Sequence, residues 1–368
     1  MKIGILTYHR SLNYGALLQA KALQDFVRGL GHDVSIVDYW PLYHEDMYKP
    51  FSWKLFNRYS IRWKVEYLLK FLFTFIRLNL RRSRTREYIK KYLTVTDNKI
   101  FDIVLYGSDQ IWRKQHQPAC EWYNPVYWGE GFVQTTHRIA YAASMGRIEI
   151  ENTKDLFFIK HHLDQFDAIG LREKDLIDRF LQEFSIEYPM VCDPVFLLTK
   201  EQWTKHVDKK YIPKCNYILY YRLQDLEATD RMVEDLHKKT GYDIIELRGR
   251  IPFFHYGRRY RYTADAQEFL SLIYGANYVV TSSFHGISLS IIFEKQFLFA
   301  SQKKVANRVF SLLNQLGLES RFFDGGNDII DIVDNPIDYA PVRRAGYMFA
   351  SQSREWLSRQ LENCKTQS

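Results

Sequence analysis

His285 lies between two segments of opposite character. Tyr278–Thr281 is a run of β-branched and aromatic residues without charge, which predicts a buried strand. Ser282 and Ser283 interrupt this run, Gly286 permits a tight turn, and apolar residues then continue at helical spacing. The amides and the dipole at the start of a helix attract anions, and an imidazole there can bind a phosphate or carboxylate or transfer a proton near neutral pH. A helix cap beside a histidine of the core is the alternative interpretation.

Two further polar side chains directly follow predicted strands. Arg172 follows Ala168–Leu171, and Asp109 follows Phe101–Tyr106 by three residues. Because parallel strands end at one edge of a sheet, we expect both side chains near a ligand site. Arg172 can bind a phosphate or carboxylate through two N–H groups, or form a surface ion pair with Glu173 or Asp175. Asp109 can accept a hydrogen bond or a proton from a hydroxyl, or cap the helix that follows it.

The elements that would position these residues form a repeating pattern. A chain of 368 residues exceeds the usual size of one hydrophobic core, so two domains are expected. Strand patterns alternate with helix patterns in both halves, which is typical of parallel sheets covered by helices. The predicted strands are residues 2–7, 33–38, 101–106, 139–143, 168–171, 216–221, 243–247, 278–281 and 296–299; the predicted helices are 16–30, 153–166, 174–184, 226–240, 265–275 and 352–364. We therefore predict an α/β fold with two Rossmann-like domains that face a cleft.

The predicted domain boundaries follow from this pattern. Residues 1–190 form the N-terminal Rossmann-like domain, with a basic amphipathic insertion at residues 49–91. Residues 191–345 form the C-terminal Rossmann-like domain, and Asp193 before Pro194 is assigned to the turn between the two. Residues 346–368 contain a final helix, and its return to the first domain is one option.

The positive charge is concentrated in one segment. The chain carries a net charge of +8, and residues 49–91 contain thirteen Lys or Arg residues but only two Glu residues. One interpretation is a pair of helices that pack on the domain with a solvated basic face. The other is an amphipathic helix within residues 51–86 that contacts an anionic membrane surface. Because no nucleic-acid-binding motif accompanies the charge, we do not expect a nucleic-acid partner.

The composition limits the location and the cofactors. The four cysteines are far apart and form no Cys-x-x-Cys pair, so neither a zinc site nor a disulfide framework is expected. The chain also lacks a secretion signal and any apolar stretch of about 18 residues. We therefore expect a cytoplasmic protein, with peripheral attachment to the inner face of the cell membrane as an option. The sequence does not predict an oligomeric state.

Seven short segments occur together in a defined order. They are residues 13–24, 107–112, 140–146, 171–174, 192–198 and 281–286, followed by Asn307-Arg308 before Leu312-Leu313 and Leu316-Gly-Leu318. Together they resemble the polysaccharide pyruvyl transferase family, over residues 2 to about 321. The resemblance is weakest over the basic segment and over residues 205–262.

The resemblance implies both a fold and a reaction. The fold would be that of the GT-B glycosyltransferases, with the acceptor on the first domain and the donor on the second. The donor would be phosphoenolpyruvate, whose three-carbon unit forms a ketal with two hydroxyls of one sugar while phosphate leaves. The acceptor would belong to a cell-surface or capsular polysaccharide or to its lipid-linked precursor. Such a reaction requires no metal and no cofactor.

These requirements assign roles to particular residues. The catalytic candidates are His285, Asp109 and Arg172, with protonated His285 either as general acid or only as a phosphate ligand. Phosphoenolpyruvate carries two anionic groups, and its candidate ligands are Arg172, Ser282, Ser283, His285, Gly286 and Arg308, although Arg308 fits a helix-surface ion pair equally well. The candidate acceptor ligands are Asn13, Tyr14, Asp109, Gln110, Trp112 and Ser144, although aromatic residues this frequent are often part of the core. The basic and aromatic segment at residues 248–261 is either a lid over the cleft or a solvated loop.

Two other functions fit the same sequence. One is a GT-B glycosyltransferase that uses a nucleotide sugar, with His285 and Arg172 holding a diphosphate. The other is a non-catalytic binding or assembly protein of a surface-polysaccharide pathway, held to the membrane by residues 51–86.

Overall fold

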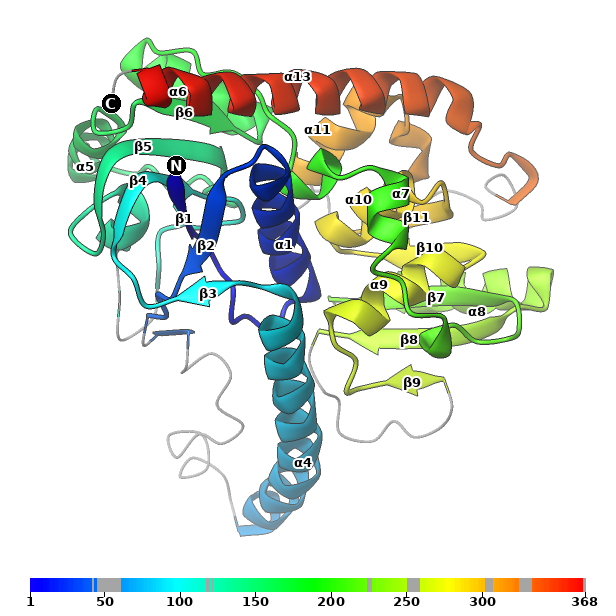
Figure 1. Ribbon diagram of the computed structural model, residues 1–368. Helices are drawn as coiled ribbons and strands as arrows, with labels where there is room; N and C mark the ends of the chain where they lie inside the picture. The colour runs from blue at the N-terminus through cyan, green and yellow to red at the C-terminus, as the bar shows by residue number, and fades with distance from the viewer. Residues whose placement is uncertain are drawn as a thin grey trace.

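The computed structural model describes residues 1–41, 43–44, 61–116, 120, 122–223, 227–249, 259–301, 307–323 and 333–366, with the backbone alone for 61–64, 66–67, 69–74, 228 and 307–308. Within these residues the chain forms two parallel sheets of six strands each, which lie in separate halves of the molecule (Figure 1). Helices pack against both sheets, as the alternating sequence pattern predicts.

The first sheet has the strand order β3-β2-β1-β4-β5-β6. Its strands are β1 (Lys2–Leu6), β2 (Asp33–Val37), β3 (Val95–Thr96), β4 (Ile100–Tyr106), β5 (Gln134–Ala143) and β6 (Ala168–Leu171). Its helices are α1 (Tyr14–Gly29), α4 (Ile61–Tyr92), α5 (Thr153–Leu163) and α6 (Lys174–Phe184). All five predicted strands of this half are present, whereas the two residues of β3 are too few to give a sequence pattern.

The second sheet has the order β12-β11-β10-β7-β8-β9. Its strands are β7 (Tyr217–Arg222), β8 (Asp243–Arg248), β9 (Tyr260–Arg261), β10 (Tyr278–Thr281), β11 (Gln296–Ala300) and β12 (Phe322–Phe323). Its helices are α8 (Glu227–Thr240), α9 (Ala266–Gly275), α10 (Phe284–Ile292) and α11 (Asn307–Leu316). The short helix α7 (Lys200–Thr204) precedes this sheet, and α13 (Tyr339–Thr366) follows it.

Both sheets have the strand order of a classical dinucleotide-binding domain. The order reverses between β1 and β4 in the first sheet and between β7 and β10 in the second. Ligands of open α/β sheets bind outside the carboxyl ends of the strands at this point of reversal. The predicted fold class, two Rossmann-like domains that face a cleft, is therefore confirmed.

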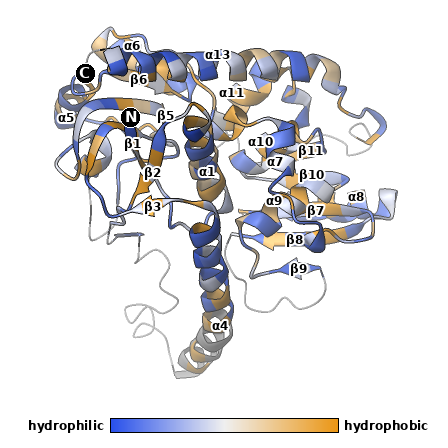
Figure 2. Ribbon diagram, viewed as in Figure 1, coloured by the Kyte–Doolittle hydropathy of each residue, from blue (hydrophilic) through white to orange (hydrophobic). Residues whose placement is uncertain are grey.

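The hydrophobic core crosses between the two halves. Hydrophobic residues are concentrated in the strands of both sheets (Figure 2), and one cluster of buried side chains includes residues from each half. The ring of Tyr14 in α1 stacks on Phe269 in α9, with a distance of 5.0 Å between ring centroids. The halves therefore share buried apolar contacts, and the first turn of α1 lies against the second domain.

The C-terminal helix α13 extends along both halves (Figure 1). The Oγ of its Ser353 accepts a hydrogen bond of 2.9 Å from the amide of Cys192. Trp356 packs near Tyr141 of β5, at 6.1 Å between ring centroids. The helix is longer than predicted, because Pro341 and Gly346 interrupt the helical sequence pattern in its first turns.

The described part of the basic segment is one long helix, α4, rather than a pair of helices; residues 45–60 lie outside the described residues. Arg81 is buried, and its Nη2 donates to the carbonyl of Leu12 at 2.9 Å while its Nη1 donates to the carbonyls of Arg248 and Gly249. Arg84 binds Glu268 at 2.6 Å. These two arginines join the domains, although the predicted alternatives placed them on a solvated or membrane-facing surface.

The N-terminal part of α4 extends beyond both sheets (Figure 1). Among the described residues, no helix combines the length and the apolar character needed to cross a membrane.

Candidate functional site

A cavity of about 160 Å³ lies where the two points of strand reversal face each other. The first domain contributes side chains that follow β1 and β4, and the second contributes side chains that follow β7, β10 and β11. The lining residues are Asn13, Asp109, Gln110, Leu223, Ser282, Ser283, Phe284, His285, Phe299, Ser301 and Val309. The cavity therefore contains polar groups from both domains.

His285 lies in the first turn of α10. The Oγ of Ser283 caps this helix by accepting a hydrogen bond of 3.2 Å from the amide of Gly286. The helix starts immediately after β10 because Ser282 and Ser283 end the apolar run and Ser283 suits the N-cap position. The positive end of the helix dipole consequently points toward the cavity that His285 and Ser283 line. This arrangement suits an anionic ligand.

Behind the cavity, His285 and Arg172 converge on one carboxylate. The Oδ2 of Asp193 lies 3.5 Å from Nε2 of His285 and 2.5 Å from Nη1 of Arg172. The hydroxyl of Ser108 donates to the same Oδ2 at 3.3 Å, and Nη1 of Arg172 donates to this hydroxyl at 3.3 Å. All four residues are at least nine-tenths buried. The carboxylate therefore connects side chains from different domains.

The electrostatics favour the charged form of Asp193. Burial alone would raise the pKa of this carboxyl, but His285, Arg172 and the amide of Val195 outweigh burial and hold the pKa well below its usual range. Burial opposes the charge of Arg172 in the same way, yet Glu173 and Asp193 raise the pKa of the guanidinium.

Arg172 does not line the cavity. Its side chain is only 3% exposed, its Nε donates to Glu173 at 2.9 Å, and its guanidinium lies 4.9 Å from the ring centroid of Phe284. The Nη2 atom is buried and has no hydrogen-bond partner among the described residues. The predicted direct contact between Arg172 and a substrate anion is therefore not observed, and the ion pair with Glu173 is present but buried rather than on the surface.

Three of the predicted acceptor ligands line the cavity. Asn13, Asp109 and Gln110 do so from the first domain. The Oδ1 of Asn13 also caps α1 by accepting from the amide of Gly15 at 3.0 Å, and Oδ1 of Asp109 accepts from the amide of Gln110 at 2.9 Å. The carboxylate of Asp109 and the amide of Asn13 each have more than one hydrogen-bonding atom, so the cap does not use all of them.

The other three predicted acceptor ligands are buried away from the cavity. Tyr14 stacks in the interdomain core, and Trp112 is fully buried and stacks on Trp128 at 4.4 Å. Ser144 is also fully buried, and its Oγ accepts from the amide of Gly146 at 3.0 Å. A sugar cannot reach these side chains in this arrangement, so the predicted acceptor role is withdrawn for all three.

Gly286 and Arg308 are the remaining predicted donor ligands. The amide of Gly286 donates to Ser283, and Gly286 does not line the cavity. A Cβ at this position would lie 2.9 Å from the Thr281 side chain, so the glycine permits close packing of α10 on β10 rather than contact with a ligand. The side chain of Arg308 and most of the predicted lid at residues 248–261 lie outside the described residues.

Sequence reasoning missed the role of Asp193 and Ser108. Oδ1 of Asp193 does hold the predicted turn, because it accepts from the amide of Val195 at 3.1 Å. Its other oxygen, Oδ2, contacts Arg172 and His285. The sequence gives no sign of this second role, because His285 is distant from Asp193 along the chain and Arg172 lies in another segment. Among the described residues, no group of three or more His, Cys, Asp or Glu side chains is arranged to hold a metal ion.

Comparison with known proteins identifies the family. The sequence profile of the polysaccharide pyruvyl transferases matches residues 13–303. The chain belongs to the polysaccharide pyruvyl transferase family. Membership makes it a transferase of polysaccharide biosynthesis with a sugar or polysaccharide as acceptor, which confirms the family that the seven segments predicted. No curated protein matches the sequence.

Solved structures of other families share the fold of this pyruvyl transferase family member. A UDP-GlcNAc 2-epimerase from Methanocaldococcus jannaschii superposes with a TM-score of 0.52 and 10% identity, covering 99% of this chain and 100% of its own. A putative UDP-N-acetylglucosamine 2-epimerase from Listeria monocytogenes gives a TM-score of 0.54 and 9% identity, with 100% and 97% coverage. At such low identity the likeness shows only that two-domain folds of this kind are shared.

Proposed function

We propose that the chain transfers the three-carbon unit of phosphoenolpyruvate to two hydroxyls of one sugar and forms a ketal. The observation that carries the proposal is the single cavity that joins the first turn of α10, with His285 and Ser283, to Asp109 of the opposite domain. Within a family of pyruvyl transferases, one end of this cavity suits a small anion and the other suits a hydroxyl.

The proposed donor site lies at the first turn of α10. The helix dipole and the hydroxyls of Ser282 and Ser283 would bind the phosphate or the carboxylate of phosphoenolpyruvate. The carboxylate of Asp193 lies behind His285, with its Oδ2 3.5 Å from Nε2 of the ring. His285 can then give a proton to the methylene carbon, which makes the adjacent carbon electrophilic. Arg172 would act by holding Asp193 in place.

The proposed acceptor chemistry uses the opposite wall. Asp109 would accept the proton of the first sugar hydroxyl as its oxygen bonds to C2 of the enol ester. Phosphate then leaves, and the second hydroxyl attacks the same carbon and loses its proton. One C–H bond, two C–O bonds and one O–H bond on phosphate form, while the C=C π bond, two O–H bonds of the sugar and one C–O bond to phosphate break.

The size of the cavity favours a small donor over a nucleotide sugar. Its volume of about 160 Å³ is below the ~300–1,000 Å³ that is usual for drug-sized ligands. Titration calorimetry with phosphoenolpyruvate and, separately, with UDP-N-acetylglucosamine distinguishes the two donors. We expect heat from phosphoenolpyruvate alone, whereas binding of the nucleotide sugar alone would support a glycosyltransferase. A non-catalytic pathway protein would retain its cellular function after His285→Ala.

We also propose that the enzyme contacts the cytoplasmic face of a membrane through α4 and so reaches a lipid-linked acceptor. Val65, Leu68, Ile76 and Leu80 are each about half exposed, and helical spacing places them on one face of α4. Arg82 and Arg86 follow on the same helix and favour anionic headgroups.

Vesicle sedimentation tests this contact. We expect the wild type to sediment with vesicles of phosphatidylserine and phosphatidylcholine, and the double variant Leu68→Gln, Ile76→Gln to remain in solution. Leu181→Gln replaces an equally exposed leucine on α6 and serves as the control. Sedimentation of the double variant at the wild-type level would overturn the proposal.

A further inference from the structure

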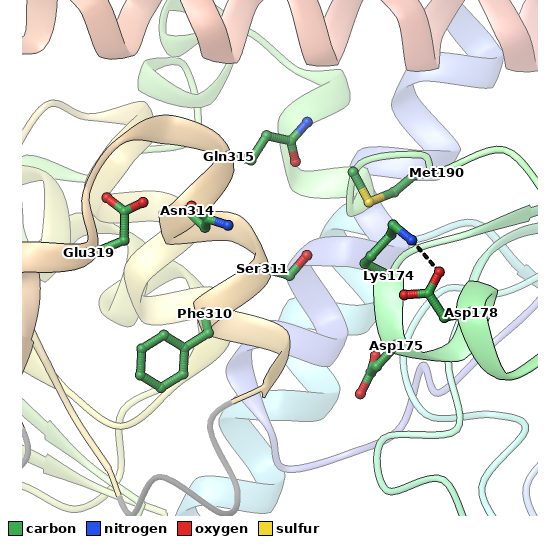
Figure 3. A pocket seen from close by; sticks show the side chains of 9 residues that line it. All are labelled: Lys174, Asp175, Asp178, Met190, Phe310, Ser311, Asn314, Gln315 and Glu319. Atoms are coloured by element: carbon green, nitrogen blue, oxygen red, sulfur yellow. Dashed lines mark hydrogen bonds and ion pairs between the residues drawn. The ribbon is translucent and has the colours of Figure 1, made fainter.

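A second and larger cavity lies between the two domains. It has a volume of about 600 Å³, and its walls are α6 of the first domain and α11 of the second (Figure 3). We call it the α6–α11 groove. The lining residues are Lys174, Asp175, Asp178, Met190, Phe310, Ser311, Asn314, Gln315 and Glu319. Its volume is within the range of ~300–1,000 Å³ that is usual for small-molecule sites.

The lining of the groove suits a neutral ligand with many hydroxyls. Amide and hydroxyl groups come from α11, where Ser311 points toward Lys174 on the facing helix (Figure 3). Carboxylates come mainly from α6, and Phe310 lines the groove while its ring packs on Phe322, with 4.4 Å between ring centroids. Carboxylates and amides hydrogen-bond hydroxyls as acceptors and donors.

The charges in the groove argue against a phosphate or nucleotide. Lys174 is the single cation among the described lining residues, and it forms an ion pair with Asp178. Asp175 and Glu319 add further negative charge. A diphosphate would therefore be repelled, whereas an uncharged saccharide would not.

The groove and the cavity around His285, here called the reaction cavity, take residues from neighbouring positions of the chain. On α11, Val309 lines the reaction cavity and the next residue, Phe310, lines the groove. On the first domain, Lys174 in the groove follows Arg172 of the buried ion-pair network by two residues. The two cavities are therefore formed in part by the same helix, α11.

We propose that the α6–α11 groove binds the sugar units of the acceptor glycan that neighbour the unit receiving the pyruvyl group. The inference rests on the proposed function. The groove would contact the acceptor in place of Tyr14, Trp112 and Ser144, which are buried. Residues of both domains, rather than of the first alone, would then recognise the acceptor.

A matched pair of substitutions tests the groove. Asn314 and Asn363 are both exposed on helices, and only Asn314 lines the groove. Asn314→Trp should fill the groove, and Asn363→Trp should leave it open. We would measure binding of the fluorescently labelled wild type and both variants to an array of bacterial surface oligosaccharides. We expect the wild type and Asn363→Trp to bind the same glycans and Asn314→Trp to bind them at least tenfold more weakly.

A second variant and a donor measurement complete the test. Ser311→Ala removes one hydroxyl without adding bulk and should weaken binding of the same glycans to a smaller extent. Calorimetric binding of phosphoenolpyruvate should be equal in all four proteins. If the wild type does not bind phosphoenolpyruvate, the proposed function is overturned. Glycan binding in the groove is then still supported by the array result. The proposal that the groove binds glycan would be overturned if Asn314→Trp and Asn363→Trp bound glycans equally. It would also be overturned if the wild type bound no glycan.

Discussion

The imidazole of His285 packs against the backbone of Gly15 across the domain boundary. A Cβ atom at residue 15 would lie 2.2 Å from Nδ1 of His285, far closer than any van der Waals contact. Gly15 is the second residue of α1, whose N-cap is Asn13. The start of α1 therefore limits the orientation of the His285 side chain at the start of α10. The position of the candidate catalytic ring therefore depends on how the two domains pack.

Substitution of Gly15 should impair catalysis more than folding. In Gly15→Ala the added methyl group must displace the His285 ring, and we expect kcat to fall at least tenfold, because small misplacement of catalytic groups has effects of up to ~100-fold. Gly29→Ala, in the last turn of the same helix, is the control because a Cβ there meets nothing within 4 Å. It should leave kcat unchanged and stabilise the helix by about 0.5–1 kcal/mol. Equal kcat for both variants would show that the His285–Gly15 contact has no role in activity.

Removal of the charge at Asp193 should destabilise the protein strongly. Asp193→Asn leaves the buried guanidinium of Arg172 with Glu173 as its remaining acidic partner, and we expect the free energy of unfolding to fall by about 3–5 kcal/mol. Urea denaturation measures this change. Asp178→Asn breaks the exposed pair with Lys174 and should cost at most about 1 kcal/mol. A similar small cost for both substitutions would contradict the importance of the buried network.

The buried imidazole of His44 should make stability depend on pH. Burial lowers the pKa of His44 to about 4, whereas the ordinary value is 6.5. Between these values the unfolded chain binds more protons, so stability is fully present above about pH 6.5 and is lost as the pH falls toward 4. From pH 7 to pH 5 this group alone should lower the free energy of unfolding by about 2 kcal/mol.

Chemical denaturation of two variants isolates the contribution of His44. His44→Phe retains a ring beside Tyr8, Trp40 and Tyr43 and should lose about 2 kcal/mol less than the wild type over this interval. His161→Phe, at an exposed position of α5, should behave as the wild type does. An unchanged pH dependence in His44→Phe would refute this assignment.

The ion pairs of Arg84 should contribute to the packing of α4 on the second domain. Its guanidinium contacts Glu268 at 2.6 Å and Asp265 at 3.1 Å, and both carboxylates are largely buried. Arg84→Gln should lower the free energy of unfolding by about 2 kcal/mol, because two buried acceptors lose a charged donor. Arg231→Gln breaks an exposed pair with Glu227 within α8 and should cost no more than about 0.5 kcal/mol. If thermal unfolding shows equal effects, Arg84 is not an interdomain contact of consequence.

The fold was largely predictable because its signals are local. Runs such as Ile3–Leu6 and Tyr278–Thr281 are apolar over the length of a strand, and both become fully paired central strands. His285 and Asp109 were found as cavity residues for the same reason, since each directly follows the end of such a run. The position of a residue after a strand is therefore visible in the sequence.

The failures concern contacts between distant residues. Nothing near Trp112 in the sequence shows that its ring stacks on Trp128, and nothing near Tyr14 shows that it packs on Phe269 of the other domain. The burial of Arg172 has the same origin, because Asp193 and Phe284 cover it from other segments. Side-chain type identifies candidates for chemistry, whereas exposure depends on tertiary packing.

Release of inorganic phosphate from phosphoenolpyruvate, with mass measurement of the glycan product, tests the central claim most directly. With a glycan that the wild type binds, we expect phosphate and a product heavier by pyruvate less water in equal amounts. His285→Ala should lower the rate at least 100-fold, in line with the ~10²–10⁴-fold contribution of a general acid, and His161→Ala should retain the wild-type rate. Phosphate release at the wild-type rate by His285→Ala, or no pyruvylated product from the wild type, would contradict the account.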